Sequence, residues 1–215
     1  MHEHEHRPGG NGHDLASWEE RYRGAPALWS GRVNPPLVTE AGDLVPGRAL
    51  DVGCGEGGDV LWLAGRGWQV TGLDWSQVAL ARAAEHATAA GLSERVTWVC
   101  GDVDSWQPPT GAFDLVTAHF LHPPADLLGE VVRRLGEAVA PGGTLLHVAH
   151  DPRDSEALHR DPALTRLMPP LERVVGLLDP AHWDVRVAEV QARQQVFQGE
   201  PVTLHDTVVR AVRVP

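Results

Sequence analysis

The chain has 215 residues, enough for one domain with its own hydrophobic core. Hydrophobic residues make up 42% of it and charged residues 22%, which excludes an intrinsically disordered protein. The formal net charge is −11 and every basic residue other than histidine is arginine, which argues against nucleic acids and anionic membranes as partners.

Targeting signals are not evident in the sequence. No apolar run approaches the ~20 residues that cross a bilayer, and the first ten residues lack the apolar stretch of a secretory signal. We therefore expect a cytoplasmic protein. Its two cysteines, Cys54 and Cys100, cannot form a disulfide framework and should be reduced.

Residues 1–13 are rich in histidine and glycine and show no periodicity, which predicts a disordered tail. Histidine-rich tracts can hold a divalent metal loosely, so a metal-chaperone role for this tail is one alternative. A solvated tail is the interpretation that we prefer.

Two short helices are expected next, in a segment (residues 14–45) that could form a lid over the rest of the domain. The first covers residues 14–23, with Asp14 as its N-cap. Its buried face should consist of Leu15, Trp18 and Tyr22. The second helix opens at Pro35.

From Arg48 onward, strand-like runs alternate with helical runs, within a core segment of residues 46–151. The strand-like runs are RALDVG, WQVTGLD, RVTWVCGD, FDLVTAHF and TLLHVAH. The helical runs are EGGDVLWLAGRG, SQVALARAAEHATAAGL (capped by Ser76) and DLLGEVVRRLGEAVAPGG. This alternation predicts an α/β fold: a doubly wound, mostly parallel sheet with helices on both faces.

Residues 152–215 should complete the single domain, residues 14–215. A helix interrupted around Pro169 and Pro170 comes first. Two strand-like runs follow, HWDVRVAEVQA and TVVRAVRV, joined by a QGEP turn. Because no helix separates these runs, we expect an antiparallel hairpin at one edge of the sheet.

The strongest functional signal is the run DVGCGEGG, residues 51–58, between the first strand and the next helix. Gly53, Gly55 and Gly57 form a G-x-G-x-G loop, whose glycines permit tight turns and close approach to a ligand. The helix N-terminus behind the loop offers N–H groups and the positive end of a dipole. The run therefore predicts a cofactor-binding loop.

Carboxylates follow at the ends of the next two strands. Asp74 lies 74 − 53 = 21 residues after Gly53, an offset at which a carboxylate accepts hydrogen bonds from ribose hydroxyls. Asp102 follows the third strand, where it could accept a proton from an adenine amino group while the Val103 amide donates to a ring nitrogen.

Two cofactors compete for such a loop, a nicotinamide dinucleotide and S-adenosylmethionine (SAM). Dinucleotide sites use G-x-G-x-x-G to hold a pyrophosphate, whereas the spacing here is G-x-G-x-G. Asp51 before the loop and Glu56 within it would repel a pyrophosphate and attract the ammonium group of a methionine moiety. The charge argument favours SAM.

In combination these motifs resemble those of the class I SAM-dependent methyltransferases. The matching runs are ALDVGCGEGGDVLWLA, LDWS, CGDV, FDLVTAHFLH and APGGTLLHV, within roughly residues 40–150. The resemblance implies a Rossmann-like sheet of seven strands in the order 3-2-1-4-5-7-6. The run WEERYRGAPALWSGRVNPPLV resembles the N-terminal lid of the thiopurine and tellurite-resistance branch, which makes Trp29 a candidate lid contact and Arg32 a candidate partner of the methionine carboxylate.

The residues expected to bind the cofactor lie in these motifs. They are Trp29, Arg32, Asp51, Gly53, Cys54, Gly55, Gly57, Asp74, Trp75, Asp102, Val103 and His119. The Cys54 side chain is expected to pack against its neighbours and not to act as a nucleophile.

The acceptor should lie beyond the fourth strand, where the run TAHFLHP (residues 117–123) is found. His119 and His122 are candidate bases or acceptor-positioning groups, and His150 with Asp151 after the fifth strand are the second choice. These four residues could also form an open metal site, but the resemblance implies no metal.

The predicted function is methyl transfer from SAM to a small-molecule acceptor through sulfur, oxygen or nitrogen, with a preference for a thiol or another soft nucleophile. The product would be S-adenosylhomocysteine. We expect no nucleic-acid or membrane partner, and a monomer or a homodimer. The alternatives are a nicotinamide-dependent oxidoreductase and a non-catalytic SAM-binding regulator.

Overall fold

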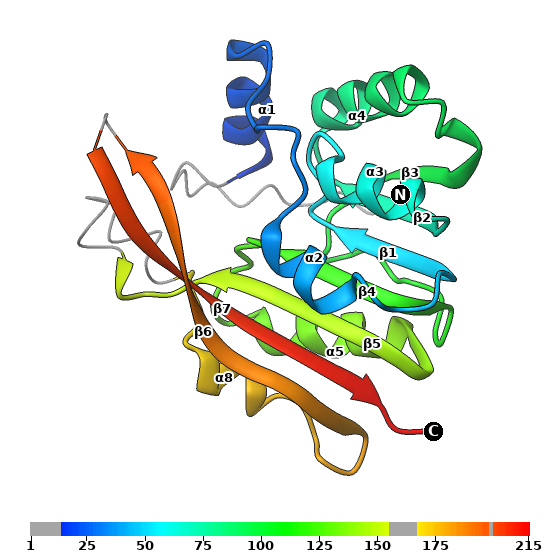
Figure 1. Ribbon diagram of the computed structural model, residues 1–215, viewed down its shortest axis with the longest axis vertical. Coiled ribbons are helices and arrows are strands. Elements are labelled where there is room, and N and C mark those ends of the chain that lie inside the picture. Colours follow the sequence, from blue (N-terminus) through cyan, green and yellow to red (C-terminus); the bar gives the residue numbers. More distant parts are fainter. Residues whose placement is uncertain (1–13, 155–166, 198–199) are drawn as a thin grey trace, which may run out of the picture.

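Seven strands form one mixed sheet at the centre of the computed structural model, which describes residues 14–154, 167–197 and 200–215 (Figure 1). The strands are β1 (Arg48–Val52), β2 (Gln69–Asp74), β3 (Val96–Cys100), β4 (Phe113–His119), β5 (Val139–His150), β6 (Trp183–Phe197) and β7 (Glu200–Arg213). Their order is β3-β2-β1-β4-β5-β7-β6. Strands β1 to β5 pair in parallel, and β7 runs antiparallel to both β5 and β6. The predicted fold class, strand order and edge hairpin are therefore confirmed.

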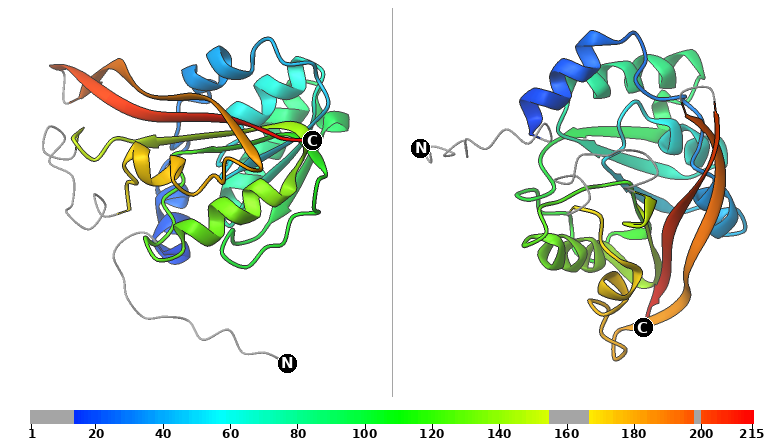
Figure 2. Two further views of the ribbon diagram at one scale, coloured as in Figure 1. Left: turned by 90° about the horizontal axis from the view of Figure 1, so that it is seen from below. Right: turned by 90° about the vertical axis from the view of Figure 1, so that its left-hand side faces the viewer.

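Helices cover both faces of this sheet (Figures 1 and 2). They are α1 (Leu15–Gly24), α2 (Pro35–Ala41), α3 (Gly58–Gly65), α4 (Gln77–Ala89), the 3₁₀ turn η1 (Ser93–Arg95), α5 (Leu128–Ala138) and α8 (Leu171–Val175). The predicted caps are present: Asp14 accepts from the Ser17 amide and Ser76 from the Ala79 amide. Among the described residues, none of these helices is both long and apolar enough to cross a membrane.

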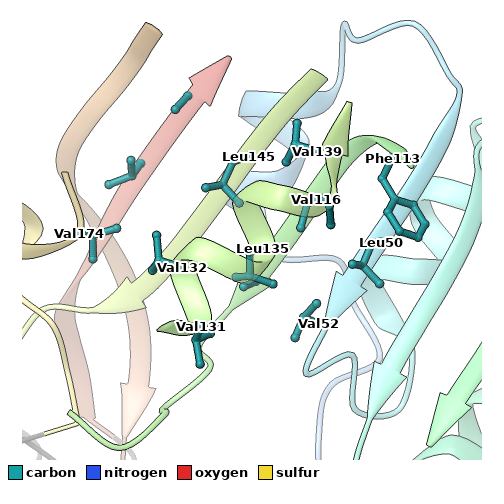
Figure 3. Packing of buried hydrophobic residues seen from close by; sticks show 14 of the residues in the cluster. Leu50, Val52, Phe113, Val116, Val131, Val132, Leu135, Val139, Leu145 and Val174 are labelled. Atoms are coloured by element: carbon teal, nitrogen blue, oxygen red, sulfur yellow. The ribbon is translucent and has the colours of Figure 1, made fainter. Parts of the chain in front are cut away.

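The alternation of side chains along the strands divides the core into two layers. On one face, Leu50 and Val52 of β1 pack toward Val131 and Leu135 of α5, and Val174 of α8 joins the same cluster (Figure 3). On the other face, residues of α2, α3 and α4 cover the sheet. The buried side chain of Asp51 lies between Leu50 and Val52 in sequence and therefore points to this second face.

Three parts of the fold differ from the sequence-based prediction. Strand β5 begins at Val139, so the run APGG belongs to the strand and not to the end of α5. Strands β6 and β7 are longer than the predicted runs and continue toward the turn. In α1 the buried residues are Glu19 and Tyr22, whereas Leu15 is 40% exposed. The predicted tail, residues 1–13, lies outside the described residues.

His147 of β5 is buried on the α5 face, and its Nδ1 has no hydrogen-bond partner among the described residues. Burial, with a contribution from His119, lowers the pKa of His147 to about 4. The folded protein therefore keeps this ring neutral at a pH where the unfolded chain, with a pKa near 6.5, takes up a proton. The stability contributed by the neutral ring is lost as pH falls from about 6.5 toward 4.

We predict that His147→Leu makes the protein less sensitive to acid. The wild type should lose on the order of 3 kcal/mol of unfolding free energy through this one residue between pH 7 and pH 4. Urea unfolding at several pH values should show a flatter pH dependence for the variant. The exposed His182, replaced by leucine, is the control, and equal slopes in the wild type and His147→Leu would contradict the assignment.

Candidate active site

The glycine loop joins β1 to α3 at the carboxyl edge of the sheet. Gly53, Gly55 and Gly57 all have positive φ angles, of 75°, 52° and 86°. The amides of Gly53 and Cys54 both donate to the Leu73 carbonyl at the end of β2, at 2.8 and 3.0 Å. The loop is therefore fixed to β2 by its own backbone.

Asp74 completes this attachment. One of its carboxylate oxygens accepts from the Gly55 amide at 2.8 Å and the other from the Ser76 amide at 2.9 Å. Burial raises the pKa of Asp74, against the effect of these hydrogen bonds. The residue expected to hold a ribose thus also holds the glycine loop and the start of α4 in place.

The neighbouring Trp75 lines a hollow of about 580 Å³ between α1 and the start of α4. Glu19 of α1 and Cys100 at the end of β3 line the same hollow.

Asp102 and Val103 lie in the loop after β3. The Asp102 carboxylate accepts a hydrogen bond from the Asp104 amide at 2.9 Å, and the Val103 carbonyl accepts one from Arg134 of α5. Local backbone hydrogen bonding therefore occupies the side chain of Asp102.

Cys54 lies inside the glycine loop and packs its thiol into the core on the α3 face. Burial, followed by the charges of Asp51 and Asp74, raises the pKa of this thiol well above its ordinary value. A protonated, buried thiol is a poor nucleophile. The interpretation of Cys54 as a packing residue agrees with this position.

Glu56 departs from the role inferred for it from the sequence. Its buried carboxylate accepts from the backbone amides of Leu28 and Trp29, at 3.0 to 3.2 Å, and from Arg82 of α4 at 2.7 Å. These partners, against the effect of burial, lower its pKa. Arg82 also donates to the carbonyls of Tyr22 and Ala25. Glu56 therefore fastens residues 25–29 to the loop, and the expectation that it attracts a cofactor ammonium is wrong because its charge is already paired.

Trp29 lies directly over the loop. Its indole N–H donates to the Tyr22 hydroxyl at 3.0 Å, and a Cβ placed on Gly55 would lie 3.3 Å from that indole nitrogen. Half of the Trp29 side chain is exposed. The side chain of Arg32 is exposed, while its carbonyl lies close to Gly58 at the start of α3.

A second cluster lies at the ends of β1 and β4, on the face covered by α3. His119 donates from Nδ1 to Asp59 at 2.6 Å, and Asp51 accepts from the Thr117 hydroxyl at 2.7 Å. Asp59 also accepts from the amide and the side chain of Asn34, at 2.7 and 2.8 Å. Nε2 of His119 is buried and has no hydrogen-bond partner among the described residues.

The charges in this cluster are strongly coupled. Burial raises the pKa of Asp51 to about 7, and the neighbouring Asp59 adds to the rise. Burial also opposes a charge on His119, but the carboxylate of Asp59 outweighs it and raises the pKa of His119. The pKa of Asp59 is lowered in spite of burial, mainly by the charge of His119. Both shifts favour the form of the pair in which Asp59 is a carboxylate and His119 an imidazolium.

Ligand atoms of Asp51, Asp59 and His119 lie within 4.8 Å of one another, close enough for a metal ion. Thr117 and Asn34 already donate hydrogen bonds to the two carboxylates, however, and His119 Nδ1 is directed at Asp59. The site that the sequence suggested for a metal was a different one, with His122, His150 and Asp151 in place of the two carboxylates. Within the described part of the chain, those residues do not gather around His119 as ligands.

The second-choice residues form a separate cluster beyond β4 and β5. The His150 ring stacks on Phe120 with the ring centres 4.4 Å apart, and the His122 ring lies 5.7 Å from it. Phe120 has a φ of 54°, a strained value for a residue other than glycine. His150 contacts Asp206 of β7, whereas the carboxylate of Asp151 pairs with Arg153.

Sequence reasoning missed several residues that carry this site. The sequence analysis singled out neither Asp59, in the first turn of α3, nor Arg82, in the alanine-rich helix α4. Asn34 and Glu19 gave no signal of their own. The one clue available for Asp59 was its position directly behind the glycine loop, where a helix begins.

Comparison with known proteins identifies a protein family that matches the part of the chain containing this site. Residues 49–143 match the family described as a methyltransferase domain. The chain is 38% identical over 102 residues to thiocyanate methyltransferase 1 of Arabidopsis thaliana, covering 46% of this chain and 44% of that protein. It is 37% identical over 110 residues to the ribosomal RNA small subunit methyltransferase C of Alcanivorax borkumensis, covering 49% and 33%. The chain thus spans less than half the length of these curated relatives.

One solved structure resembles the chain over nearly its whole length. That structure comes from work on the "Conversion of a Disulfide Bond into a Thioacetal Group during Echinomycin Biosynthesis". Its TM-score is 0.76 and its sequence identity 26%, and the match covers 93% of both chains.

The residues at this edge of the sheet fit SAM, the cofactor of this class. Three buried carboxylates, those of Asp51, Asp59 and Asp74, surround the loop, and within the described ranges only Asp59 of these three has a charged partner. A sulfonium and an ammonium would relieve the electrostatic cost of burying the other two. A pyrophosphate would add to that cost. Residues 49–143 are therefore a methyltransferase domain of class I, the S-adenosylmethionine-dependent kind.

Proposed function

We propose that this protein transfers a methyl group from SAM to a sulfur nucleophile on a small molecule. The observation that carries the cofactor half of this proposal is the set of buried carboxylates around the glycine loop. The sulfur half is supported by the relatives: one is named for thiocyanate, and the structure similar over 93% of both chains comes from work on the conversion of a disulfide.

The ribosomal RNA methyltransferase among the relatives suggests a different acceptor, but the charge of this chain opposes it. RNA binding depends on basic side chains that neutralise phosphates. The chain has 29 acidic residues against 18 basic ones and no lysine. A small acceptor fits this charge balance better.

Each part of the cofactor would have its own residues. Asp51 would face the methionine ammonium, and Asp74 with Trp75 the ribose and adenine. Asp102 and Val103 would border the adenine, and Trp29 would cover the ligand from the side of α1. These assignments combine the resemblance of the motifs with the positions of these residues at the carboxyl edge, where open α/β sheets bind ligands.

The bound cofactor supplies an electrophilic methyl group on a sulfonium, so the protein mainly has to orient the acceptor. His119 is the last residue of β4 and His122 follows the strand, and both would contact the acceptor. Because the charged form of His119 is favoured, this ring would donate a hydrogen bond through Nε2 and would not act as a base.

The test is a binding and transfer assay with the full chain. Calorimetric titration with SAM and S-adenosylhomocysteine should give a Kd in the micromolar range, which corresponds to a binding free energy of about −8 kcal/mol. Methyl-labelled SAM should then label thiocyanate, 2-mercaptoethanol or a dialkyl disulfide in preference to a phenol or a primary amine. Binding without transfer to any of them would favour a non-catalytic regulator. No binding of either ligand would refute the cofactor assignment, and NADH would be tested next.

We predict that the affinity for SAM rises with pH around neutrality. The pKa of Asp51 is about 7 in the protein, so its carboxylate ionises between about pH 6 and pH 8, and the ionised form attracts the cationic cofactor. Calorimetry at pH 6 and pH 8 should show about tenfold tighter binding at the higher pH. Asp51→Asn should bind more weakly and with a flat pH dependence, and a flat profile in the wild type would contradict the prediction.

A further inference from the structure

His119 belongs to a chain of buried hydrogen bonds that begins in the N-terminal segment. Asn34, the residue before α2, donates twice to Asp59 of α3, at 2.7 and 2.8 Å. Asp59 accepts from Nδ1 of His119 at 2.6 Å. Only 2% of the His119 side chain and 7% of that of Asp59 are exposed, so three elements distant in sequence hold one imidazole ring in a fixed orientation.

This arrangement leaves one polar atom of the ring without a partner. With Nδ1 bound to Asp59, Nε2 is buried and has no hydrogen-bond partner among the described residues. A buried polar atom without a partner is costly, and a ligand that supplies the partner recovers that cost. Nε2 of His119, at the end of β4, is therefore the atom of the His119–Asp59 pair that would bind a ligand.

The charged groups around His119 decide whether Nε2 donates or accepts. Burial disfavours a charge on His119, but Asp59 on α3 and Asp51 on β1 outweigh it and raise the pKa of the ring. His147 on β5 also interacts with the ring, and its own pKa is lowered to about 4, so it stays neutral near pH 7. An imidazolium has N–H groups at both nitrogens and can only donate. A hydrogen bond from a cation to an anion is among the strong ones, and an imidazolium also favours a thiolate over its thiol.

We infer that Nε2–H of His119 binds an anionic sulfur acceptor, a thiolate or a thiocyanate-like anion, and that Asp59 and Asn34 are its positioning residues. This inference rests on the proposed function and specifies the acceptor of that same site. It places opposite charges on the two sides of the reaction: the carboxylate of Asp51 faces the cationic cofactor, and an imidazolium faces the nucleophile. In the transfer the acceptor sulfur bonds to the methyl carbon as the carbon–sulfonium bond breaks, and the departing sulfide keeps that electron pair.

Two methyl acceptors distinguish a His119 that donates a hydrogen bond from a His119 that acts as a general base. Thiocyanate is a permanent anion with no proton to lose, whereas 2-mercaptoethanol must lose a proton before it reacts. If His119 donates to the anion, His119→Phe should lower kcat/KM ten- to hundredfold for both acceptors. If His119 were a general base, the variant would lose activity toward the thiol and keep it toward thiocyanate, which would overturn the inference.

The positioning residues have their own readouts. Asp59→Asn keeps a hydrogen-bond acceptor for Nδ1 but removes the charge, so the acceptor KM should rise while the Kd for SAM changes less than threefold. Asn34→Ala should act in the same direction more weakly. His182→Phe, at an exposed histidine before β6, should match the wild type. A fall in kcat with unchanged acceptor KM in Asp59→Asn would indicate that Asp59 does not act through His119.

A spectroscopic measurement keeps the inference testable even if neither acceptor is methylated. Nitrogen-15 NMR of the histidine rings, assigned with His119→Phe, should show both nitrogens of His119 protonated at pH 7 in the wild type. In Asp59→Asn the ring should become neutral at a lower pH than in the wild type. A neutral His119 in the wild type at pH 7 would overturn the inference, whereas failure of SAM to bind would refute the proposed function and leave this result unchanged.

Discussion

Arg82→Met should lower the free energy of unfolding by about 3 kcal/mol and weaken cofactor binding at the same time. Arg82 is the partner of the Glu56 carboxylate, whose side chain is only 3% exposed. Removing the guanidinium leaves a buried negative charge without a countercharge, which is more damaging than losing the attraction alone. It also removes the hydrogen bonds that hold the carbonyls of Tyr22 and Ala25 at the end of α1.

Thermal unfolding measures the first effect and SAM titration the second. For a chain of this length, about 3 kcal/mol corresponds to a drop in Tm of roughly 6 to 12 °C. The matched control is Arg23→Met, which removes an exposed arginine that pairs with Glu19 on the same lid and should cost less than about 1 kcal/mol. The double variant Glu56→Gln, Arg82→Met should be more stable than Arg82→Met alone, because the unpaired charge is gone. If the double variant and Arg82→Met are equally unstable, the unpaired charge of Glu56 is not the cause of the destabilisation.

The fold was predictable because its signals are local. Alternating strand and helix patterns, the glycine loop after Val52 and the caps at Asp14 and Ser76 each specify structure within a few residues. The lengths of β6 and β7 were not predictable in this way. Their outer parts pair with each other beyond the end of β5, so polar residues such as Gln194 extend the ladder without an alternating pattern.

The site was predictable only where a residue acts through the backbone near it. The glycines and Asp74 follow fixed offsets from strand ends, so sequence spacing located them. Glu56 was misassigned because its partner Arg82 lies 26 residues away on another helix, and sequence alone shows the acid without the base. Asp59 was missed because its role depends on His119, 60 residues later. Pairings between distant buried charges become visible only when the fold brings them together.

The Trp29 contact makes the glycine loop a place where a small change should have a large effect. Gly55→Val should weaken SAM binding by at least a hundredfold, for two separate reasons. Gly55 has a φ of 52°, which a β-branched residue avoids. Its Cβ would also lie 3.2 Å from the Tyr22 hydroxyl and 3.3 Å from the Trp29 indole nitrogen, so the branched side chain would displace the lid residue expected to cover the cofactor.

Gly91→Val separates these two reasons. Gly91 follows α4 with a φ of 69°, and no atom lies within 4 Å of the position of an added Cβ. This variant should share the backbone strain, about 1 to 2 kcal/mol of stability, without affecting SAM binding. Calorimetric titration and Trp fluorescence of both variants test the difference, since the displaced indole of Trp29 should change its emission only in Gly55→Val. If the two variants bind SAM equally well, close packing of the lid on the loop is not required for the cofactor site.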